Sequence, residues 1–306
     1  MQVFKAAQHL RMKPLSVNDR RTIPIPPVSA KPLARLPLSQ VVNKRIDLTK
    51  SHQSRSIPTK APPALRVQPP VKTTTANIEQ YRGIGTNKDL IIVGNGPSHA
   101  MAPLQLLKGL LNVDIMSVNK PDERLWPTTS WVFCDNTQRD RHRAIWETYT
   151  GPCFNTPSVK DERSNTVRLS SMTNFGFSDE ITKGVFIGRS SVYTAMQIAL
   201  WMGYDHIYIF GCDMGPVDGR LYPWGSNPDV SDAVRAKRFE GEALNYQWAA
   251  DNLDPAKRSR FTFCTEFNPF PFVKQFNALG HQEAVYHIVN KHTPKDETEQ
   301  TTSAGV

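Results

Sequence analysis

Apolar and polar residues alternate along residues 86–292 in blocks that favour strands and helices in turn. Short apolar runs predict buried strands, at residues 89–93, 113–118, 130–134, 153–156, 184–187, 206–210 and 260–264. Apolar residues at helical spacing predict helices, at residues 103–111, 138–149, 191–202, 235–253 and 271–278. This alternation predicts an α/β domain with a mostly parallel, Rossmann-like sheet and helices on both faces.

Residues 1–85 show neither the two-residue period of a strand nor the 3.6-residue period of a helix. They hold fifteen Lys and Arg residues against three Asp and Glu residues, a net charge of +12, and 11 of the 24 prolines. A basic, proline-rich segment with few apolar clusters buries too little surface to offset its ordering entropy. We therefore predict a basic, extended or disordered arm and linker over residues 1–85. A nucleotide-binding domain follows over residues 86–292, and a disordered polar tail over residues 293–306.

The charge of the basic arm indicates that this segment binds a macromolecular partner. Extended basic segments bind the phosphate backbone of nucleic acids, or they thread across protein assemblies; a solvated linker is the structural alternative. The chain has no run of the roughly 20 apolar residues that a membrane span requires, and its first residues lack the apolar stretch of a secretory signal. These features predict a cytoplasmic protein, in the host cytoplasm if a phage encodes it, or one associated with a virion.

A glycine-rich turn follows the first predicted strand and reads Gly94-Asn95-Gly96-Pro97-Ser98. Glycines allow backbone N–H groups to approach a phosphate closely, and the Asn95 and Ser98 side chains can add hydrogen bonds. The turn departs from the dinucleotide-binding fingerprint because Pro97 follows the second glycine. It therefore predicts a phosphate-binding loop, with an ordinary turn as the alternative.

Polar residues also end three other strands. Asn119 follows the second strand, Asp135 and Asn136 follow the third, and Asp213 follows the strand at residues 206–210. Ligands of open parallel sheets bind outside the carboxyl ends of the strands. We therefore expect these side chains to line a nucleotide pocket. Asp135 and Asp213 are the predicted catalytic groups, and their carboxylates are also the predicted ligands of Mg²⁺ or of a ribose.

Two serines, Ser190 and Ser191, precede the clearest predicted helix. They can cap the helix, or they can place its N-terminus against phosphate oxygens. The loop over residues 222–228 combines aromatic and turn residues, which suits a lid or an acceptor platform. The eight histidines form no metal-binding spacing, so zinc is not expected.

A family resemblance rests on three stretches of this sequence, which read IIVGNGPS, then VN at the end of the second strand, then SSVYTAMQIALWMGYDHIYIFGCDM. Over residues 88–278 the chain resembles a superfamily of Rossmann-like transferases. This superfamily includes bacterial CMP-sialic-acid-dependent sialyltransferases, MAF flagellin glycosyltransferase-like proteins, MptE-like pterin diphosphokinases and uncharacterised phage proteins.

The resemblance implies that Asn95, Asn119 and Ser190 contact the nucleotide. Asp135 departs from the Asn of the sialyltransferases and is similar to the MptE or MAF pattern. The sialyltransferases also carry a catalytic His in the loop that follows the position of Asp213. Here no histidine lies between residues 206 and 281, so the base that deprotonates an acceptor hydroxyl would have to be another group, such as Asp213 or Asp218.

The leading prediction is a nucleotide-dependent, glycosyltransferase-like enzyme from a phage or a bacterium. Its donor would be a nucleotide-activated sugar, with CMP as the first candidate nucleotide, and its acceptor is open. Two alternatives remain. The missing histidine and the basic arm favour a degenerate transferase domain that serves as a virion or nucleic-acid-associated protein. Asp135 and Asp213 favour Mg²⁺-dependent pyrophosphoryl transfer of the MptE type.

Overall fold

The computed structural model describes residues 77–161, 163–172, 175–225 and 231–294, all of which belong to one unit of the chain. The predicted arm, apart from its last residues, and nearly all of the predicted tail lie outside the described residues. Within the described part, no helix combines the length and the apolar composition needed to cross a membrane.

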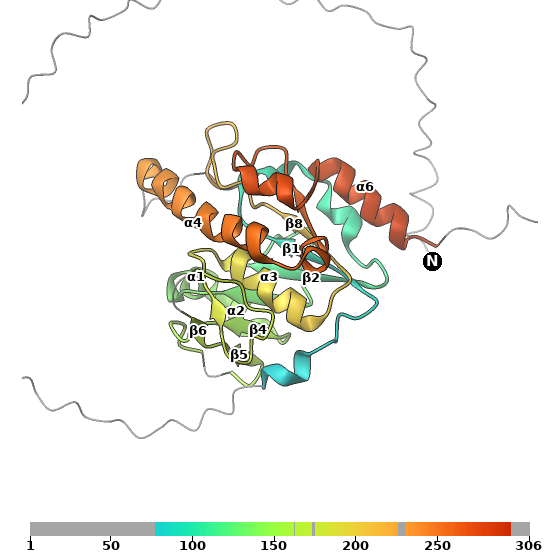
Figure 1. Cartoon of the computed structure of the whole chain (residues 1–306). Coiled ribbons are helices and arrows are strands. Elements are labelled where there is room, and N and C mark those ends of the chain that lie inside the picture. The colour runs from blue at the N-terminus through green and yellow to red at the C-terminus, as the bar shows by residue number, and fades with distance from the viewer. Residues whose placement is uncertain (1–76, 162, 173–174, 226–230, 295–306) are drawn as a thin grey trace, which may run out of the picture. The chain divides into compact units, whose positions relative to one another are not determined.

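The predicted parallel sheet is confirmed (Figure 1). It has eight strands in the order β10-β9-β8-β1-β2-β3-β4-β5, and every neighbouring pair is parallel. The strands are β1 (Asp89–Val93), β2 (Val113–Val118), β3 (Ser130–Phe133), β4 (Cys153–Asn155), β5 (Thr166–Arg168), β8 (His206–Phe210), β9 (Phe261–Cys264) and β10 (Asn277–Leu279). A second sheet pairs β6 (Ser171–Met172) with β7 (Val185–Phe186).

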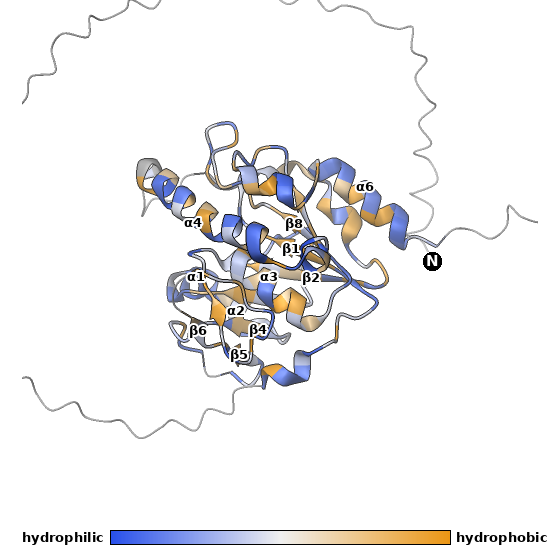
Figure 2. Ribbon diagram, in the orientation of Figure 1, coloured by the Kyte–Doolittle hydropathy of each residue, from blue (hydrophilic) through white to orange (hydrophobic). Residues whose placement is uncertain are grey.

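Helices cover both faces of the large sheet. They are α1 (Asn136–Arg141), α2 (Arg143–Thr148), α3 (Ser191–Met202), α4 (Asp232–Asn252), α5 (Pro255–Arg258) and α6 (His281–His292). Short 3₁₀ turns are η3 (Ile78–Tyr81), η4 (Pro97–Met101), η5 (Leu104–Leu107) and η6 (Pro271–Gln275). Figure 2 shows both hydrophilic and hydrophobic stripes along α4 and α6, as expected of helices with one face on the sheet.

The central strand β1 shows how the two faces of the core arise. Leu90 and Ile92 pack in the cluster that contains α3 and α4, whereas Ile91 and Val93 pack in the cluster that contains α6. Successive side chains of a strand point to opposite faces, so an unbroken apolar run is required where both faces are covered. All four side chains are at most 1% exposed, which places β1 in the middle of three layers.

The strand order reverses at β1. From β1 the chain adds β2, β3, β4 and β5 on one side, and later returns through α3 to place β8 on the other side of β1. Loops that leave β1 and β8 therefore diverge at the same edge of the sheet, which is where parallel α/β sheets bind ligands. The helix α3 begins at this edge and packs along β1, β2 and β3.

Two predicted helices were wrong in kind, and one predicted strand belongs to the smaller second sheet. The helix expected at residues 103–111 is only the 3₁₀ turn η5, followed by Gly109 at φ +79°. The strand expected at residues 184–187 exists as β7 but joins the second sheet. The helix expected at residues 271–278 is the turn η6 followed by strand β10. The helices α5 and α6 were not predicted.

The segment over residues 77–85, assigned to the linker from its composition, contacts the body. The Tyr81 ring lies edge-on to Phe154 at 5.2 Å, and the amide of Gly85 donates to the carbonyl of Met202 at 2.7 Å. A Cβ on Gly85 would lie 2.6 Å from the Tyr204 ring. The boundary predicted at residue 85 therefore falls inside a packed segment.

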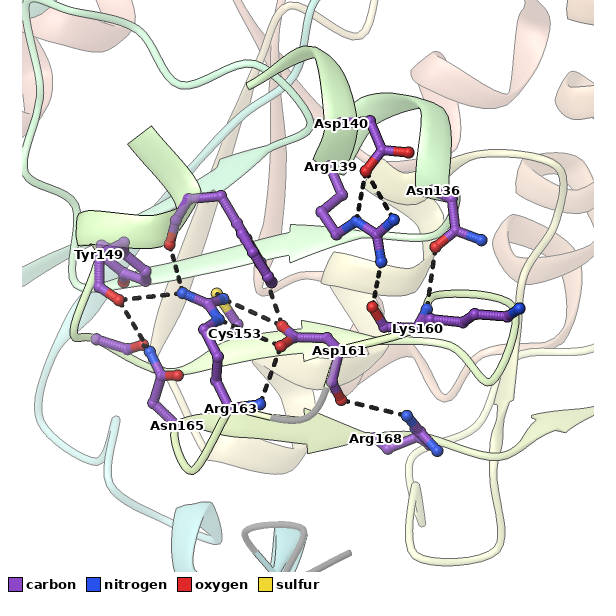
Figure 3. Close-up of polar contacts among 12 residues, drawn as sticks. Asn136, Arg139, Asp140, Tyr149, Cys153, Lys160, Asp161, Arg163, Asn165 and Arg168 are labelled. Atoms are coloured by element: carbon purple, nitrogen blue, oxygen red, sulfur yellow. Dashed lines mark hydrogen bonds and ion pairs between the residues drawn. The ribbon is translucent and has the colours of Figure 1, made fainter. Parts of the chain in front are cut away.

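A buried ion pair fastens α2 to the loop between β4 and β5 (Figure 3). The Asp161 carboxylate, whose side chain is 0% exposed, pairs with Arg163 at 3.1 Å and accepts from the Trp146 indole at 3.2 Å. The Arg163 guanidinium also lies 4.0 Å from the Trp146 ring centroid. Burial raises the pKa of Asp161, but hydrogen bonds from Arg163 outweigh it and leave this pKa below its ordinary value. Arg163 and Asp161 thus join α2 to this loop.

Candidate functional site

A pocket that is partly open to solvent lies at the carboxyl edge of β1, β2, β3 and β8. Helix α3 begins in its wall, and the first half of α4 forms another side. Of the residues predicted to form the site, the structure places seven in its lining: Asn95, Gly96, Asn119, Asp135, Ser190, Ser191 and Asp213. The predicted residues Gly94, Ser98 and Asn136 lie outside that lining.

The glycines after β1 bring two loops into contact. The amide of Gly94 donates to the Phe210 carbonyl at 2.8 Å, and the amide of Gly96 donates to the Gly211 carbonyl at 2.7 Å. A Cβ on Gly94 or Gly96 would lie only 2.6 or 2.7 Å from the same Gly211 oxygen. Close packing thus requires both glycines. Their N–H groups are bonded within the protein, so a phosphate in the pocket relies on other donors.

The side chain of Asp213 connects the loop after β1 to the end of β8. One carboxylate oxygen accepts from the Ser98 hydroxyl at 2.5 Å and from the Thr265 hydroxyl at 3.0 Å, and the other accepts from the Ser98 amide at 2.8 Å. Ser98 is 0% exposed and Asp213 is 1% exposed. The side chain of Ser98 therefore contacts Asp213 rather than the pocket, and Asp213 binds the β1 loop to the end of β8.

His99, the histidine closest to the predicted phosphate loop, contacts the backbone of that loop and a neighbouring carboxylate. Its Nδ1 lies 2.7 Å from the Gly96 carbonyl, and its Nε2 lies 3.3 Å from the Asp122 carboxylate. Arg124 contacts the same carboxylate at 2.7 Å. Burial raises the pKa of Asp122, but hydrogen bonds from His99 and Arg124 outweigh it and hold this pKa well below its ordinary value. The contacts among His99, Asp122 and Arg124 stabilise the conformation of the loop after β1.

Two asparagines at adjacent strand ends differ in their bonding. The Asn95 side chain donates to the Lys120 carbonyl at 2.9 Å and accepts from the Lys120 amide at 3.2 Å, which links the β1 and β2 loops. Asn119 has φ +56°, a left-handed conformation that asparagine tolerates. Its Oδ1 is buried and has no hydrogen-bond partner among the described residues. A buried acceptor without a partner is costly, so Asn119 is suited to receive a ligand N–H or O–H.

Asp135 and Asn136, in the segment that follows β3, have different hydrogen-bond partners. Asp135 caps helix α1 by accepting from the Gln138 amide at 2.9 Å, and its exposed side chain lines the pocket. Asn136 instead donates to the Ser158 carbonyl at 2.8 Å and accepts from the Lys160 amide at 3.0 Å, the latter shown in Figure 3. Asn136 therefore fastens the loop after β4.

The N-terminus of α3 opens into the pocket. Ser190 is the N-cap residue, but its side chain makes no capping bond and instead lies 3.0 Å from the Tyr246 hydroxyl. The first N–H groups of a helix have no intrahelical acceptor, and they carry the positive end of the helix dipole. Ser191 and Val192, which supply two of these groups, both line the pocket. This end of α3 suits an anion.

Arginines surround the same end of the pocket, and the sequence analysis did not identify them. Arg189 precedes α3, while Arg235 and Arg238 lie one turn apart on α4, and all three line the pocket. Arg235 is 8% exposed, and its Nε has no hydrogen-bond partner among the described residues. Arg238 donates to the Arg189 carbonyl at 2.7 Å. Arg235 therefore offers an unsatisfied cationic donor where the α3 dipole is positive.

One further carboxylate lies among these cations. Glu242, one turn beyond Arg238, is 6% exposed and lines the pocket. Its Oε1 lies 2.6 Å from Arg238 Nε. Burial raises its pKa to about 7, although Arg238, Arg235 and Arg189 all oppose that rise. The proton affinity of this pocket carboxyl is therefore raised by its burial.

Two aromatic side chains, Tyr222 and Trp224, also line the pocket. The Tyr222 and Trp224 rings stack at 5.2 Å with 10° between their planes. Lys120 lies 4.8 Å from the Trp224 ring centroid, and the Arg235 guanidinium lies 5.3 Å from that of Tyr222. The predicted lid or platform begins with these rings. Its remaining residues, 226–228, lie outside the described residues.

The predicted magnesium ligands, Asp135 and Asp213, are already hydrogen-bonded. Both Asp213 oxygens accept protein donors, one of them a backbone N–H that cannot bind a metal, and Asp135 caps α1. Among the described residues, no group of three or more His, Cys, Asp or Glu side chains is arranged to hold a metal ion. Magnesium binding here stays a prediction, and it would use the carboxylate lone pairs that these hydrogen bonds leave open.

Comparisons with known proteins give distant matches. No family model and no curated protein matches the sequence. One similar structure is the sialyltransferase CST-II in complex with a trisaccharide acceptor and CMP, at 11% identity and a TM-score of 0.36, with 64% of this chain and 88% of that chain covered. Another is CstII from Campylobacter jejuni with a substrate analogue, cytidine-5'-monophosphate, at 12% identity and a TM-score of 0.36, covering 67% and 98%. Similarity this low assigns no residue role and no activity to this chain.

Proposed function

We propose that the protein is a nucleotide-dependent, glycosyltransferase-like enzyme that uses a nucleotide-activated sugar, with CMP as the first candidate nucleotide. One observation carries the proposal. Ser191 and Val192, in the first turn of a helix whose N-cap side chain makes no capping bond, line the same pocket as Arg235, whose buried Nε has no partner among the described residues. The start of a helix and a guanidinium whose Nε–H lacks a partner fit an anionic ligand such as a phosphate.

The remaining lining suits the other parts of such a donor. The unpartnered Oδ1 of Asn119 matches an amino group such as that of cytosine, because a buried acceptor gains most from a donor that completes it. The exposed carboxylate of Asp135 can accept from ribose hydroxyls. The stacked rings of Tyr222 and Trp224 offer an apolar face for the base or for the transferred sugar. CMP is the first candidate because of the sequence resemblance described above.

The test is a thermal-shift screen of the full chain against CMP, UDP, GDP and ATP, each with and without Mg²⁺, since a ligand of the folded state raises its stability. We expect CMP to give the largest shift without Mg²⁺. A shift only with ATP and Mg²⁺ would instead favour pyrophosphoryl transfer. No shift with any nucleotide would contradict the proposal and favour the degenerate domain with a structural or nucleic-acid-associated role.

Arg235→Gln should weaken CMP binding by about 1.5–3 kcal/mol, a factor of roughly 10–150, because one charge-assisted hydrogen bond to the phosphate is lost. Calorimetric titration of CMP into the full chain measures this. The matched control is Lys237→Gln, which removes the same charge from the same helix at an exposed position outside the pocket lining. Equal affinities of the two variants would remove Arg235 from the phosphate site.

A further inference from the structure

The proposed transfer requires a group that accepts the proton of the acceptor hydroxyl. The sequence offers no histidine between His206 and His281, and the structure limits the carboxylates. Asp213 is bonded to Ser98 and Thr265 beneath the loop. Asp135 is exposed, and its Oδ1 is engaged in the cap of α1 by the Gln138 amide. A base must reach the substrate and keep an affinity for protons near the working pH.

Glu242 meets both requirements by its position. It lies on the wall of the pocket at 6% exposure, on the same face of α4 as Arg235 and Arg238. The Nε of Arg238 lies 2.6 Å from Oε1 of Glu242, so this ion pair holds one oxygen of the carboxylate. The donor phosphate proposed above would lie beside Arg235, so the bond to be broken lies in the same pocket as Glu242.

The surroundings of Glu242 set its proton affinity. The charged and titratable groups that face it come from three elements: Arg235, Arg238 and Tyr246 on α4, Arg189 before α3, and Cys212 after β8. Burial favours the neutral carboxyl, whereas the arginines favour the carboxylate. The balance raises the pKa to about 7, where a carboxylate can take a proton from a substrate and later release it.

We propose that Glu242 is the catalytic base of the transferase, in the role that the missing loop histidine would otherwise fill. This inference rests on the proposed function. The Glu242 carboxylate takes the proton of an acceptor hydroxyl while that oxygen forms a bond to the anomeric carbon of the donor sugar. The bond from that carbon to the phosphate oxygen breaks, and its electron pair leaves with the nucleotide, whose charge Arg235 and the start of α3 stabilise.

The first test compares Glu242→Gln with Glu240→Gln, an exposed glutamate on the same helix, in the full chain. The probes are CMP for binding and CMP-N-acetylneuraminic acid, with water and simple glycosides as acceptors, for turnover. We expect Glu242→Gln to bind CMP within threefold of the wild type and to lose at least 100-fold in turnover, with Glu240→Gln unchanged. The wild-type rate should rise about tenfold per pH unit up to about pH 7, and Glu242→Asp should recover part of it.

A second readout needs no substrate. A carboxyl whose pKa is raised on folding binds a proton in the folded state between the unfolded value, about 4.3, and the folded value, so stability falls as pH rises through that window. The melting temperature of the wild type should therefore fall relative to Glu242→Gln between about pH 4.3 and 7. Glu240→Gln should follow the wild type.

The outcomes separate the two proposals. If the wild type binds CMP and turns over the donor but Glu242→Gln keeps that turnover, Glu242 is not the base, whereas the proposed function stands. A constant difference in melting temperature across the pH range would also overturn the assignment. If the wild type neither binds CMP nor consumes any donor, the proposed function fails, and the catalytic role of Glu242 fails with it.

Discussion

Asp213→Asn is expected to lower the free energy of unfolding by about 2–4 kcal/mol. The buried carboxylate accepts three hydrogen bonds, two from Ser98 and one from Thr265, and a bond to a charged group contributes about 1.5–3 kcal/mol. An asparagine amide presents N–H groups where one carboxylate oxygen stood, so a Ser98 donor loses its acceptor. Urea denaturation of the full chain, followed by circular dichroism, measures the change.

The matched control is Asp218→Asn, in the same loop but exposed. It should stay within about 0.5 kcal/mol of the wild type, as surface substitutions usually do. If Asp213→Asn leaves stability intact and abolishes turnover, Asp213 has the catalytic or metal-binding role predicted from the sequence. Loss of stability without a specific loss of turnover identifies it as the anchor between the β1 loop and β8.

Gly211→Ala should cost about 2–5 kcal/mol. Gly211 has φ +65°, and a Cβ there would lie 2.7 Å from the Gly94 carbonyl and 3.0 Å from Nδ1 of His99. A left-handed conformation costs a non-glycine residue about 1–2 kcal/mol, and overpacking adds about 1–3 kcal/mol. Because the two pocket loops meet here, we also expect a loss of nucleotide affinity.

Gly219→Ala separates these two costs. Gly219 has φ +73°, similar to Gly211, but nothing lies within 4 Å of the position of its Cβ. This variant should lose only the conformational cost of about 1–2 kcal/mol. Equal losses for the two alanine variants, measured by the same denaturation experiment, would show that the loops can separate without cost and that their contact does not shape the pocket.

The sheet was predictable because its central strands are buried on both faces. After their first residues, Asp89 and His206, β1 and β8 are unbroken apolar runs, and α3 between them is apolar nearly all round. Elements at the margins lack such signals. β10 is mostly exposed and starts with Asn277, so only its pairing with β9 makes it a strand. The helix predicted over residues 138–149 is broken at His142, whose φ of −111° and ψ of 26° end α1.

The candidate site was predictable where it depends on strand ends. Asn95, Asn119 and Asp213 reach one edge because parallel strands share a direction. The contribution of α4 was not predictable, because it depends on how that helix docks. A signal existed in the spacing of Arg235, Arg238 and Glu242, which places three charges on one helical face, but spacing alone does not distinguish a pocket wall from a solvated face.

The most direct test of the account is a crystal structure of the full chain with CMP. We expect the phosphate to lie within hydrogen-bonding distance of the Ser191 and Val192 amides and of Arg235, with the cytosine amino group on Oδ1 of Asn119. A phosphate bound elsewhere, or a pocket that stays empty at saturating CMP, would contradict it.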